Sequence, residues 1–271
     1  MKIQEKILLN SLKAEIDPVF NQRAKFIFNQ VFKYQPKSVL DVGCGRGFYS
    51  NSLAQLPYIR EIAAIDLRKE HIKKAISKAP NTKVKYFTEN IFNWSSTKKY
   101  DLIIVSEVLE HVGDEEAFLK KIYTLLKKNG KLIITVPCED YPFFWDPINY
   151  FLKFFNTHVN KDKWFLAGIW ADHERLYNKL ELSTTVSRAN FKQVSLFSAV
   201  SYCWPFSHLL LYGIGKNLVL KFNIDSVDRF NTKPKPLAKV IATFFALPEE
   251  IMLNFNNERN KAVGLMGLWF K

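Results

Sequence analysis

Short apolar runs and amphipathic stretches alternate along the first half of the chain. Such runs are typical of strands buried in a parallel sheet, whereas apolar residues spaced three and four apart indicate a helix with one face on a core. Strand and helix alternate five times, which is the pattern of a doubly wound parallel sheet. The predicted strands lie at residues 39–42, 61–66, 84–87, 100–105 and 131–137, and the predicted helices at residues 3–33, 48–55, 70–79 and 118–128.

Two helix boundaries can be predicted from pairs of adjacent residues. Within residues 3–33 a second helix begins at Asp17-Pro18, because proline is well tolerated in the first turn of a helix. Asn129-Gly130 is suited to the left-handed cap that ends the helix at residues 118–128. The helix after Pro18 carries an apolar stripe that we expect to pack on the sheet, formed by Phe20, Ala24, Ile27, Phe28 and Val31.

A glycine-rich turn follows the first predicted strand. Gly43, Gly45 and Gly47 stand at alternate positions, and Asp41 precedes the first of them by two residues. Glycine lets the backbone turn sharply and lets a ligand lie against the main chain, while the next helix points its N-terminal amides at the same place. The spacing Gly-x-Gly-x-Gly differs from the Gly-x-Gly-x-x-Gly of dinucleotide-binding enzymes.

This turn resembles the first motif of the class I S-adenosylmethionine-dependent methyltransferases. The segments EVLEHV and LLKKNGKLIITVP resemble later motifs of the same family, so the resemblance covers roughly residues 20–137. Within the family, the chain resembles the ubiquinone-synthesis O-methyltransferase group. It implies one methyltransferase domain over residues 1–271, with a Rossmann-like, mostly parallel sheet of seven strands. The last two strands, near residues 190–200 and 262–270, would then pair antiparallel at the sheet edge.

The resemblance also implies a set of residues that bind S-adenosylmethionine. The glycine loop would wrap the amino-acid part of the cofactor, and Asp41 would orient its ammonium group. Asp66, at the end of the second strand, would accept hydrogen bonds from the ribose hydroxyls. Asn90 stands where the family usually has aspartate and keeps an oxygen acceptor for the adenine amino group. The full set is Asp41, Gly43, Gly45, Gly47, Asp66, Leu67, Asn90, Ile91 and Ser106, with Leu67 and Ile91 beside adenine.

Acidic and imidazole groups follow the fourth strand, close to where this fold holds the reacting methyl. His111 would shape the pocket or act as a base, and His173 could be the general base, since imidazole titrates near neutrality. An alternative remains open, because carboxylates and an imidazole at this spacing suit a hard divalent ion. That site would use Glu107, Glu110, His111 and His173, but we favour the interpretation without a metal.

The composition points to an anionic partner and a reducing compartment. The formal charge of +13 and the 15% aromatic content, most of it after residue 138, fit nucleic acid or an acidic membrane surface. Nucleic acid is less favoured because Lys and Arg are spread along the chain. Cys44, Cys138 and Cys203 show no ligand or disulfide spacing, and the charged N-terminal residues do not fit a signal peptide. We therefore expect a cytoplasmic protein that can associate peripherally with a membrane.

Two later segments depart from the repeating pattern. Residues 138–172 form a long aromatic segment that we interpret as a substrate or lid element, after which residues 173–177 lead to a helix ending near Arg188. Residues 201–260 are an apolar insertion between the last two strands. Its serines, proline and histidine argue against a spanning helix. Amphipathic helices on a membrane or over a greasy substrate are preferred, and a cap buried on the domain is the alternative.

These features support three hypotheses about function. The preferred one is a methyltransferase acting on a small-molecule, lipid-like or isoprenoid-like acceptor at an anionic membrane. The second is an RNA 2′-O-methyltransferase, which the charge and the Glu107, Glu110 and His111 set would fit. The third is a non-catalytic binding module that keeps the fold.

Overall fold

A sheet of seven strands forms the centre of the molecule. The computed structural model describes residues 2–78, 81–160, 166–171, 173–215, 236–255 and 261–271. The strand order is β3-β2-β1-β4-β5-β7-β6, and β7 is antiparallel to both neighbours while the other adjacent pairs are parallel. This confirms the predicted Rossmann-like fold. The strands are β1 (Ser38–Val42), β2 (Glu61–Asp66), β3 (Val84–Thr88), β4 (Tyr100–Ser106), β5 (Leu126–Pro137), β6 (Lys192–Ala199) and β7 (Gly264–Phe270).

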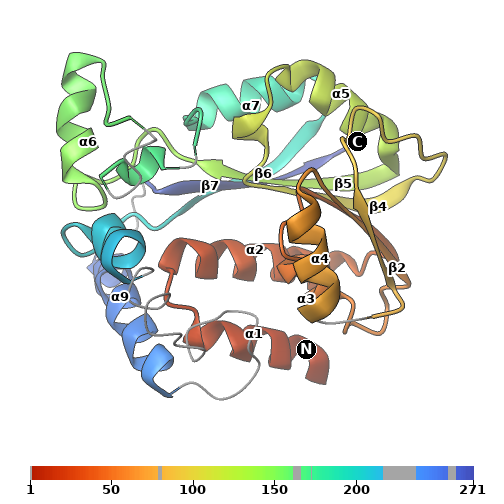
Figure 1. Cartoon of the computed structure of the whole chain (residues 1–271), viewed down its shortest axis with the longest axis horizontal. Helices are drawn as coiled ribbons and strands as arrows, with labels where there is room; N and C mark the ends of the chain where they lie inside the picture. Colours follow the sequence, from red (N-terminus) through yellow and green to blue (C-terminus); the bar gives the residue numbers. More distant parts are fainter. Residues whose placement is uncertain (1, 79–80, 161–165, 172, 216–235, 256–260) are drawn as a thin grey trace.

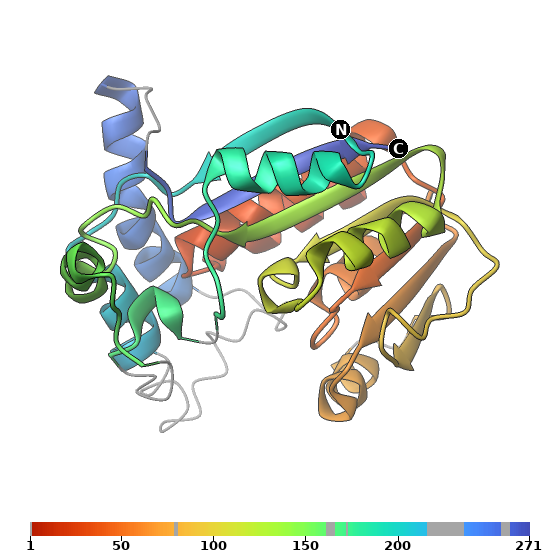
Figure 2. The same cartoon turned by 90° about the horizontal axis from the view of Figure 1, so that it is seen from above.

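Helices cover both faces of this sheet, with α5 and α7 on one face and α1, α2 and α3 on the other (Figure 1). The view from above shows α6 and α9 beyond one end of the sheet (Figure 2). The helices are α1 (Ile3–Ser11), α2 (Pro18–Tyr34), α3 (Phe48–Leu53), α4 (Lys69–Lys78), α5 (Glu115–Leu125), α6 (Pro147–Leu152), α7 (Lys179–Arg188) and α9 (Pro236–Phe255). Short turns are the 3₁₀ helices η1 (Leu12–Ala14), η2 (Leu109–His111), η3 (Lys153–Phe155) and η4 (Gly168–Trp170) and the π-helix η5 (Leu209–Gly215).

The central strand β1 is buried along its whole length. Successive side chains of a strand point to opposite faces, so Leu40 and Val42 join the core under α5 and α7, whereas Val39 joins the core under α1 to α3. One position in this apolar strand carries a charge-bearing group, the carboxyl of Asp41. An acid in the middle of a buried strand needs a specific reason to be there.

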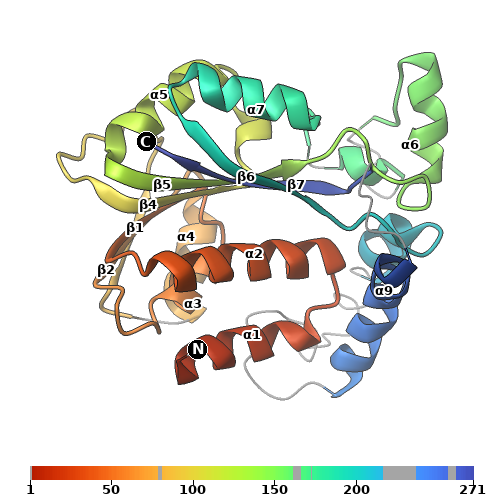
Figure 3. The ribbon, with the colours of Figure 1, turned by 180° about the vertical axis from the view of Figure 1, so that it is seen from behind.

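Helix α2 starts where the sequence predicts. The Oδ1 atom of Asp17 accepts hydrogen bonds from the backbone N–H groups of Val19 and Phe20, at 2.9 and 3.1 Å. Pro18 occupies the first turn, so cap and proline together fix the start. The predicted stripe is buried throughout: Phe20, Ala24, Ile27, Phe28 and Val31. Seen from behind, α2 lies between the sheet and α1 (Figure 3).

The predicted end of the helix at residue 128 is wrong. Helix α5 ends at Leu125, and Leu126 is already extended and paired with Tyr100 of β4. Lys127 then reaches Asp101, with 2.8 Å between Nζ and Oδ1. These contacts are made with a neighbouring strand. The spacing of apolar residues along the chain contains no information about them, so it predicted that the helix continues to residue 128. Asn129 does have a left-handed backbone, with φ of 62°, but it lies within β5 and caps no helix.

The connection between β6 and β7 holds the π-helix η5 and the helix α9. Part of the insertion predicted at residues 201–260 lies outside the described residues. Within the described chain, no helix combines the length and the apolar character that crossing a membrane requires.

Candidate functional site

The three glycines after β1 all have left-handed backbones, with φ between 53° and 76°. A Cβ atom on Gly43 would lie 2.3 Å from Cγ2 of Val108, and one on Gly47 would lie 2.6 Å from the Tyr86 hydroxyl oxygen. Close packing therefore requires glycine at those two positions. At Gly45 a Cβ atom would meet no described atom within 4 Å. The loop thus faces open space at its middle glycine, where a ligand can lie against the backbone.

Asp41 lies beneath this loop and is 2% exposed. Its Oδ2 atom accepts a hydrogen bond of 2.5 Å from the Ser50 hydroxyl at the start of α3. Burial raises the pKa of Asp41 to about 6, the bond from Ser50 opposes this rise, and the nearby charge of Asp66 adds to it. A cation placed beside this carboxyl would favour its ionised form.

Asp66 closes the other side of the loop. One carboxylate oxygen accepts a hydrogen bond from the Gly45 N–H, and the other accepts one from the Arg68 N–H, each at 2.8 Å. Nδ1 of His71 lies 3.3 Å from the same oxygen as Arg68. Asp66 therefore holds the middle of the glycine loop against the C-terminal end of β2.

The predicted adenine-side residues lie near the neighbouring strand end. The Glu89 N–H donates to the Asp66 carbonyl at 3.2 Å, which brings the segment after β3 beside Asp66. Leu67 is exposed, whereas Ile91 is buried in the core. The side-chain oxygen of Asn90 accepts a hydrogen bond from the Phe92 N–H at 3.0 Å. The acceptor that the sequence assigned to adenine is thus engaged in a local turn.

Glu107 begins a second cluster directly after β4. Its backbone is left-handed, with φ of 55°, which is unusual for a residue other than glycine and is often found at functional sites. Oε1 accepts a hydrogen bond from the Thr135 hydroxyl at 3.0 Å, and Oε2 lies 2.5 Å from Nη1 of Arg23. Ser106 contacts the same Thr135 hydroxyl at 2.9 Å. Burial disfavours the charged form of Glu107, but Arg23 and then His173 lower its pKa below the ordinary value.

Glu110 lies beside Glu107 and is fully buried. Neither of its carboxyl oxygens has a hydrogen-bond partner among the described residues. Burial, and then the charge of Glu107, raise the pKa of Glu110 well above its ordinary value. The two acids titrate as a pair, so Glu110 holds a proton while Glu107 is paired with Arg23.

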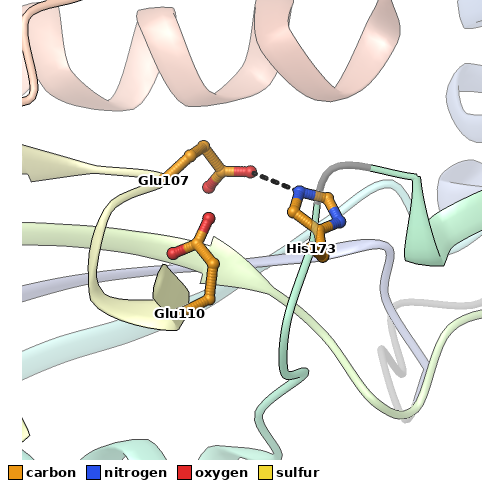
Figure 4. Close-up of side chains that lie close together, drawn as sticks. All are labelled: Glu107, Glu110 and His173. Carbon is orange, nitrogen blue, oxygen red and sulfur yellow. Dashed lines mark ion pairs between the residues drawn. The ribbon is translucent and has the colours of Figure 1, made fainter. Parts of the chain in front are cut away.

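His173 approaches this pair from the segment before α7 (Figure 4). Its Nδ1 lies 2.6 Å from the Ile169 carbonyl oxygen, so we assign the proton to Nδ1. Nε2 lies 4.0 Å from Oε2 of Glu107, so the contact is an ion pair when the ring is protonated, and Nε2 is an acceptor when the ring is neutral. His111 is farther from the cluster centre, with its ring centroid 6.3 Å from that of His173 and its Nε2 3.7 Å from Glu110.

A cavity of about 530 Å³ opens next to His173. His158 and Trp170 form part of its wall and stack with ring centroids 4.1 Å apart. Asn160 and Glu174 also line it. Polar groups and stacked aromatic rings therefore border the same space as the His173 imidazole, which suits a small organic molecule.

Glu107, Glu110 and His173 also form a group that could hold a metal ion. Each offers one ligand atom, and these atoms lie within 4.8 Å of one another. His111, the fourth ligand of the predicted alternative, is not part of this group among the described residues. Arg23 already contacts one oxygen of Glu107, so a cation of the protein itself occupies part of the shell that a metal would need.

Sequence reasoning missed Arg23 and Thr135. Arg23 projects from α2 and is the partner that keeps Glu107 ionised. It is a single cation on the otherwise apolar stripe of Phe20, Ala24 and Ile27, and that signal could have identified it. Thr135 sits within an apolar strand, where a hydroxyl needs a partner.

Comparisons with known proteins bear on this arrangement. A family model described as a methyltransferase domain matches residues 19–196. The ubiquinone biosynthesis O-methyltransferase of Rickettsia akari is 36% identical over 99 residues, covering 36% of this chain and 39% of that protein. The protein of that name from Pelagibacter ubique is 36% identical over 98 residues, covering 35% of this chain and 40% of its own. The chain thus spans about two fifths of the length of these curated relatives.

A solved structure shares the fold. Coclaurine N-methyltransferase, bound to N-methylheliamine and S-adenosylhomocysteine, superposes with a TM-score of 0.57 at 18% identity, covering 93% of this chain and 73% of that protein. The family model covers more than half of the sequence and includes both the glycine loop and the Glu107 cluster. The chain therefore belongs to the methyltransferase-domain family, and its motifs, as predicted, are those of the S-adenosylmethionine-dependent methyltransferases.

Proposed function

We propose that this protein transfers a methyl group from S-adenosylmethionine to a small-molecule acceptor. The observation that carries the proposal is the open space at Gly45, whose N–H is bonded to the Asp66 carboxylate, in a loop that directly follows the buried carboxyl of Asp41. A buried carboxyl below the loop suits the cofactor's ammonium group, and a strand-end carboxylate suits its ribose hydroxyls. The bound cofactor would supply an electrophilic methyl group on a sulfonium.

The remaining cofactor contacts follow from the strand ends. The amides around Gly43, Gly45 and Gly47 would receive the amino-acid part, with Ser106 at the end of β4. On the adenine side we propose Leu67, Asn90 and Ile91. Titration calorimetry with S-adenosylmethionine tests this assignment. Binding that is lost in Asp66→Ala supports it, whereas equal binding by the parent and Asp66→Ala removes Asp66 from the site.

For an oxygen acceptor, we propose that Nε2 of His173 takes the proton. The bond between Nδ1 and the Ile169 carbonyl leaves Nε2 free to accept, and the adjoining cavity gives an acceptor access to it. We propose His111, on η2, as a second basic group, with its Nε2 3.7 Å from Glu110. The curated relatives bear the name ubiquinone biosynthesis O-methyltransferase, which supports methylation of oxygen in this chain too.

We propose further that the acceptor is lipid-like or isoprenoid-like and is met at an anionic membrane surface on the cytoplasmic side. The aromatic segment at residues 138–172 would act as the substrate element. Its described part exposes a group of large rings at one end of the molecule, and the chain carries a formal charge of +13. These rings are Phe143, Phe144, Phe151, Phe154 and Phe155. Labelled methyl groups recovered in the lipid fraction of a lysate would support this, and label recovered only in RNA would favour an RNA 2′-O-methyltransferase.

A divalent cation at Glu107, Glu110 and His173, with His111 nearby, is a second candidate feature. The two unpartnered oxygens of Glu110 favour it, because a metal would satisfy them. Arg23 opposes it, because the pair is already balanced by one guanidinium and one proton. We therefore prefer transfer without a metal. Full activity after treatment with a chelator would support this preference, and activity that is lost and then restored by Mg²⁺ or Mn²⁺ would contradict it.

A further inference from the structure

Helix α9 turns large apolar side chains toward solvent. Leu237, Val240, Phe244, Leu247 and Ile251 recur at the three- and four-residue spacing of one helix face, and between 37% and 67% of each is exposed. A helix of a soluble domain normally turns such a stripe toward the core and its polar residues outward. In α9 an apolar stripe of this kind faces solvent.

The inner side of α9 carries Ile241 and Phe245, which are half-buried, beside smaller residues that are fully buried. Ala238 and Ala242 are the buried residues there, together with the carboxylate of Glu249. Glu249 accepts hydrogen bonds from the backbone N–H groups of Ser201 and Tyr202, at 2.9 and 2.7 Å. Gln22 of α2 also donates to Glu249, at 3.4 Å. Rolling α9 to bury its stripe would break these bonds and expose the alanines instead.

A second contact fixes the same orientation. The indole N–H of Trp204 donates to the Phe244 carbonyl at 2.7 Å, and the two rings stack with centroids 5.1 Å apart. The helix is therefore held near its N-terminal half by Trp204 and near its C-terminal half by Glu249. The outward stripe is therefore a fixed feature of the fold.

We propose that the outer face of α9 is a docking surface for an anionic lipid bilayer, with the helix lying in the headgroup region. The inference rests on the proposed function, because an enzyme with a lipid-like acceptor must meet that acceptor at the bilayer. Lys239 on α9 and Lys13 on η1, which packs against α9, are exposed near the stripe, and one carboxylate, Glu250, is exposed on α9 as well. An exposed apolar face is a feature of interfacial helices, and the net charge of +13 supplies the long-range attraction to anionic lipids.

The apolar surface continues beyond α9 at the same end of the molecule. Phe206, Leu210 and Ile214, in and beside the π-helix η5, are also exposed. All three ribbon views place α6 and α9 together at this end, away from α4 and β2 (Figures 1 and 3). Exposed apolar side chains thus come from more than one element at this end. A bilayer can contact all of them at once because it is extended and deformable, whereas a peptide would need a single groove.

The test is co-flotation of the full chain with vesicles at low salt. Phosphatidylcholine vesicles with and without phosphatidylglycerol provide the anionic and the neutral surface. We expect the parent to float with the anionic vesicles and binding to fall with salt. Leu237→Glu combined with Val240→Glu should reduce the bound fraction about tenfold or more, because two charges would enter the apolar layer. Leu180→Glu is the matched control on α7, where the leucine is 77% exposed, and it should float as the parent does.

A second measurement does not depend on how well the charged variant folds. The native cysteines are all buried, so Val240→Cys can be labelled selectively with a polarity-sensitive dye, with Leu180→Cys as its control. A blue shift with anionic vesicles at Val240→Cys alone supports docking. No shift, or equal flotation of parent and charged variant, overturns it. Sedimentation that shows a dimer broken by the charged variant, without flotation, also overturns it in favour of a second copy of the chain.

Cofactor binding separates this inference from the proposed function. If neither the parent nor any variant binds S-adenosylmethionine in calorimetry, the proposed function fails whatever the vesicles show. If the charged variant binds the cofactor as the parent does and loses only flotation, the docking surface is supported independently.

Discussion

Nη1 of Arg23 lies 2.5 Å from Oε2 of Glu107, which joins helix α2 to the loop after β4. Burial disfavours a charge on Arg23, but Glu107 overcomes this and raises the pKa of the guanidinium. Burial, and then the charge of the neighbouring Glu107, raise the pKa of Glu110 well above its ordinary value, so Glu110 holds a proton. Beside His173, the cluster thus contains the cation of Arg23, the carboxylate of Glu107 and the carboxylic acid of Glu110, so the positive charge of Arg23 is matched by the negative charge of Glu107.

Removing the cation should destabilise the protein. Arg23→Met leaves the half-buried carboxylate of Glu107 beside Glu110 without its partner, and we expect the free energy of unfolding to fall by about 1–3 kcal/mol, between the effects typical of exposed and of buried pairs. Chemical denaturation measures it. Adding Glu107→Gln to Arg23→Met should recover much of the loss, because no unpaired charge remains. A loss below about 1 kcal/mol in the single variant would show that the ion pair does not stabilise the fold.

Replacing two of the loop glycines by alanine should have different effects. Gly45→Ala should cost about 1–2 kcal/mol of stability for its left-handed backbone, keep the fold and lose cofactor affinity. Gly43→Ala should fail to fold stably, because its Cβ would meet Val108. Thermal melts with calorimetry distinguish the two. The account of the loop is wrong if Gly43→Ala folds well or if Gly45→Ala binds cofactor as the parent does.

Cofactor affinity should depend on pH through Asp41. The pKa of Asp41 is raised from 3.8 to about 6 without ligand. The protonated carboxyl therefore stabilises the folded protein fully below pH 3.8, and this stabilisation is lost as the pH rises through about 6. An ammonium group beside it favours the ionised form. Affinity should therefore rise with pH up to about 6 and then level off, with a proton released on binding below that pH. Calorimetry in buffers of different ionisation enthalpy measures the proton. No proton release, or an unchanged profile in Asp41→Asn, would refute this role.

His173 should matter to the transfer step more than to cofactor binding. His173→Asn should lower kcat by about 10²–10⁴, the usual contribution of a general base, while cofactor affinity stays the same. His111→Asn should cost less, because His111 is farther from the cluster centre. Parent-like turnover in His173→Asn would assign the proton transfer to another group.

Local signals predicted the fold well, and long-range contacts limited the prediction. Asp17-Pro18 starts α2 because cap and proline act within one turn. The end of α5 was misplaced because Leu126 is held by Tyr100 in the next strand. The Glu107 cluster was anticipated in its acids and histidines but not in Arg23, whose role depends on how α2 crosses the sheet. The exposed apolar stripe of α9 depends on the hydrogen bonds that Glu249 accepts from Ser201 and Tyr202. The spacing of residues along the helix does not reveal these bonds.

The most direct test of the central claim is transfer of labelled methyl from S-adenosylmethionine to lysate fractions by the purified full chain. The account predicts label in the lipid or small-molecule fraction, dependent on an intact loop and therefore absent with Gly45→Val. No label in any fraction, or label that persists with Gly45→Val, would contradict it.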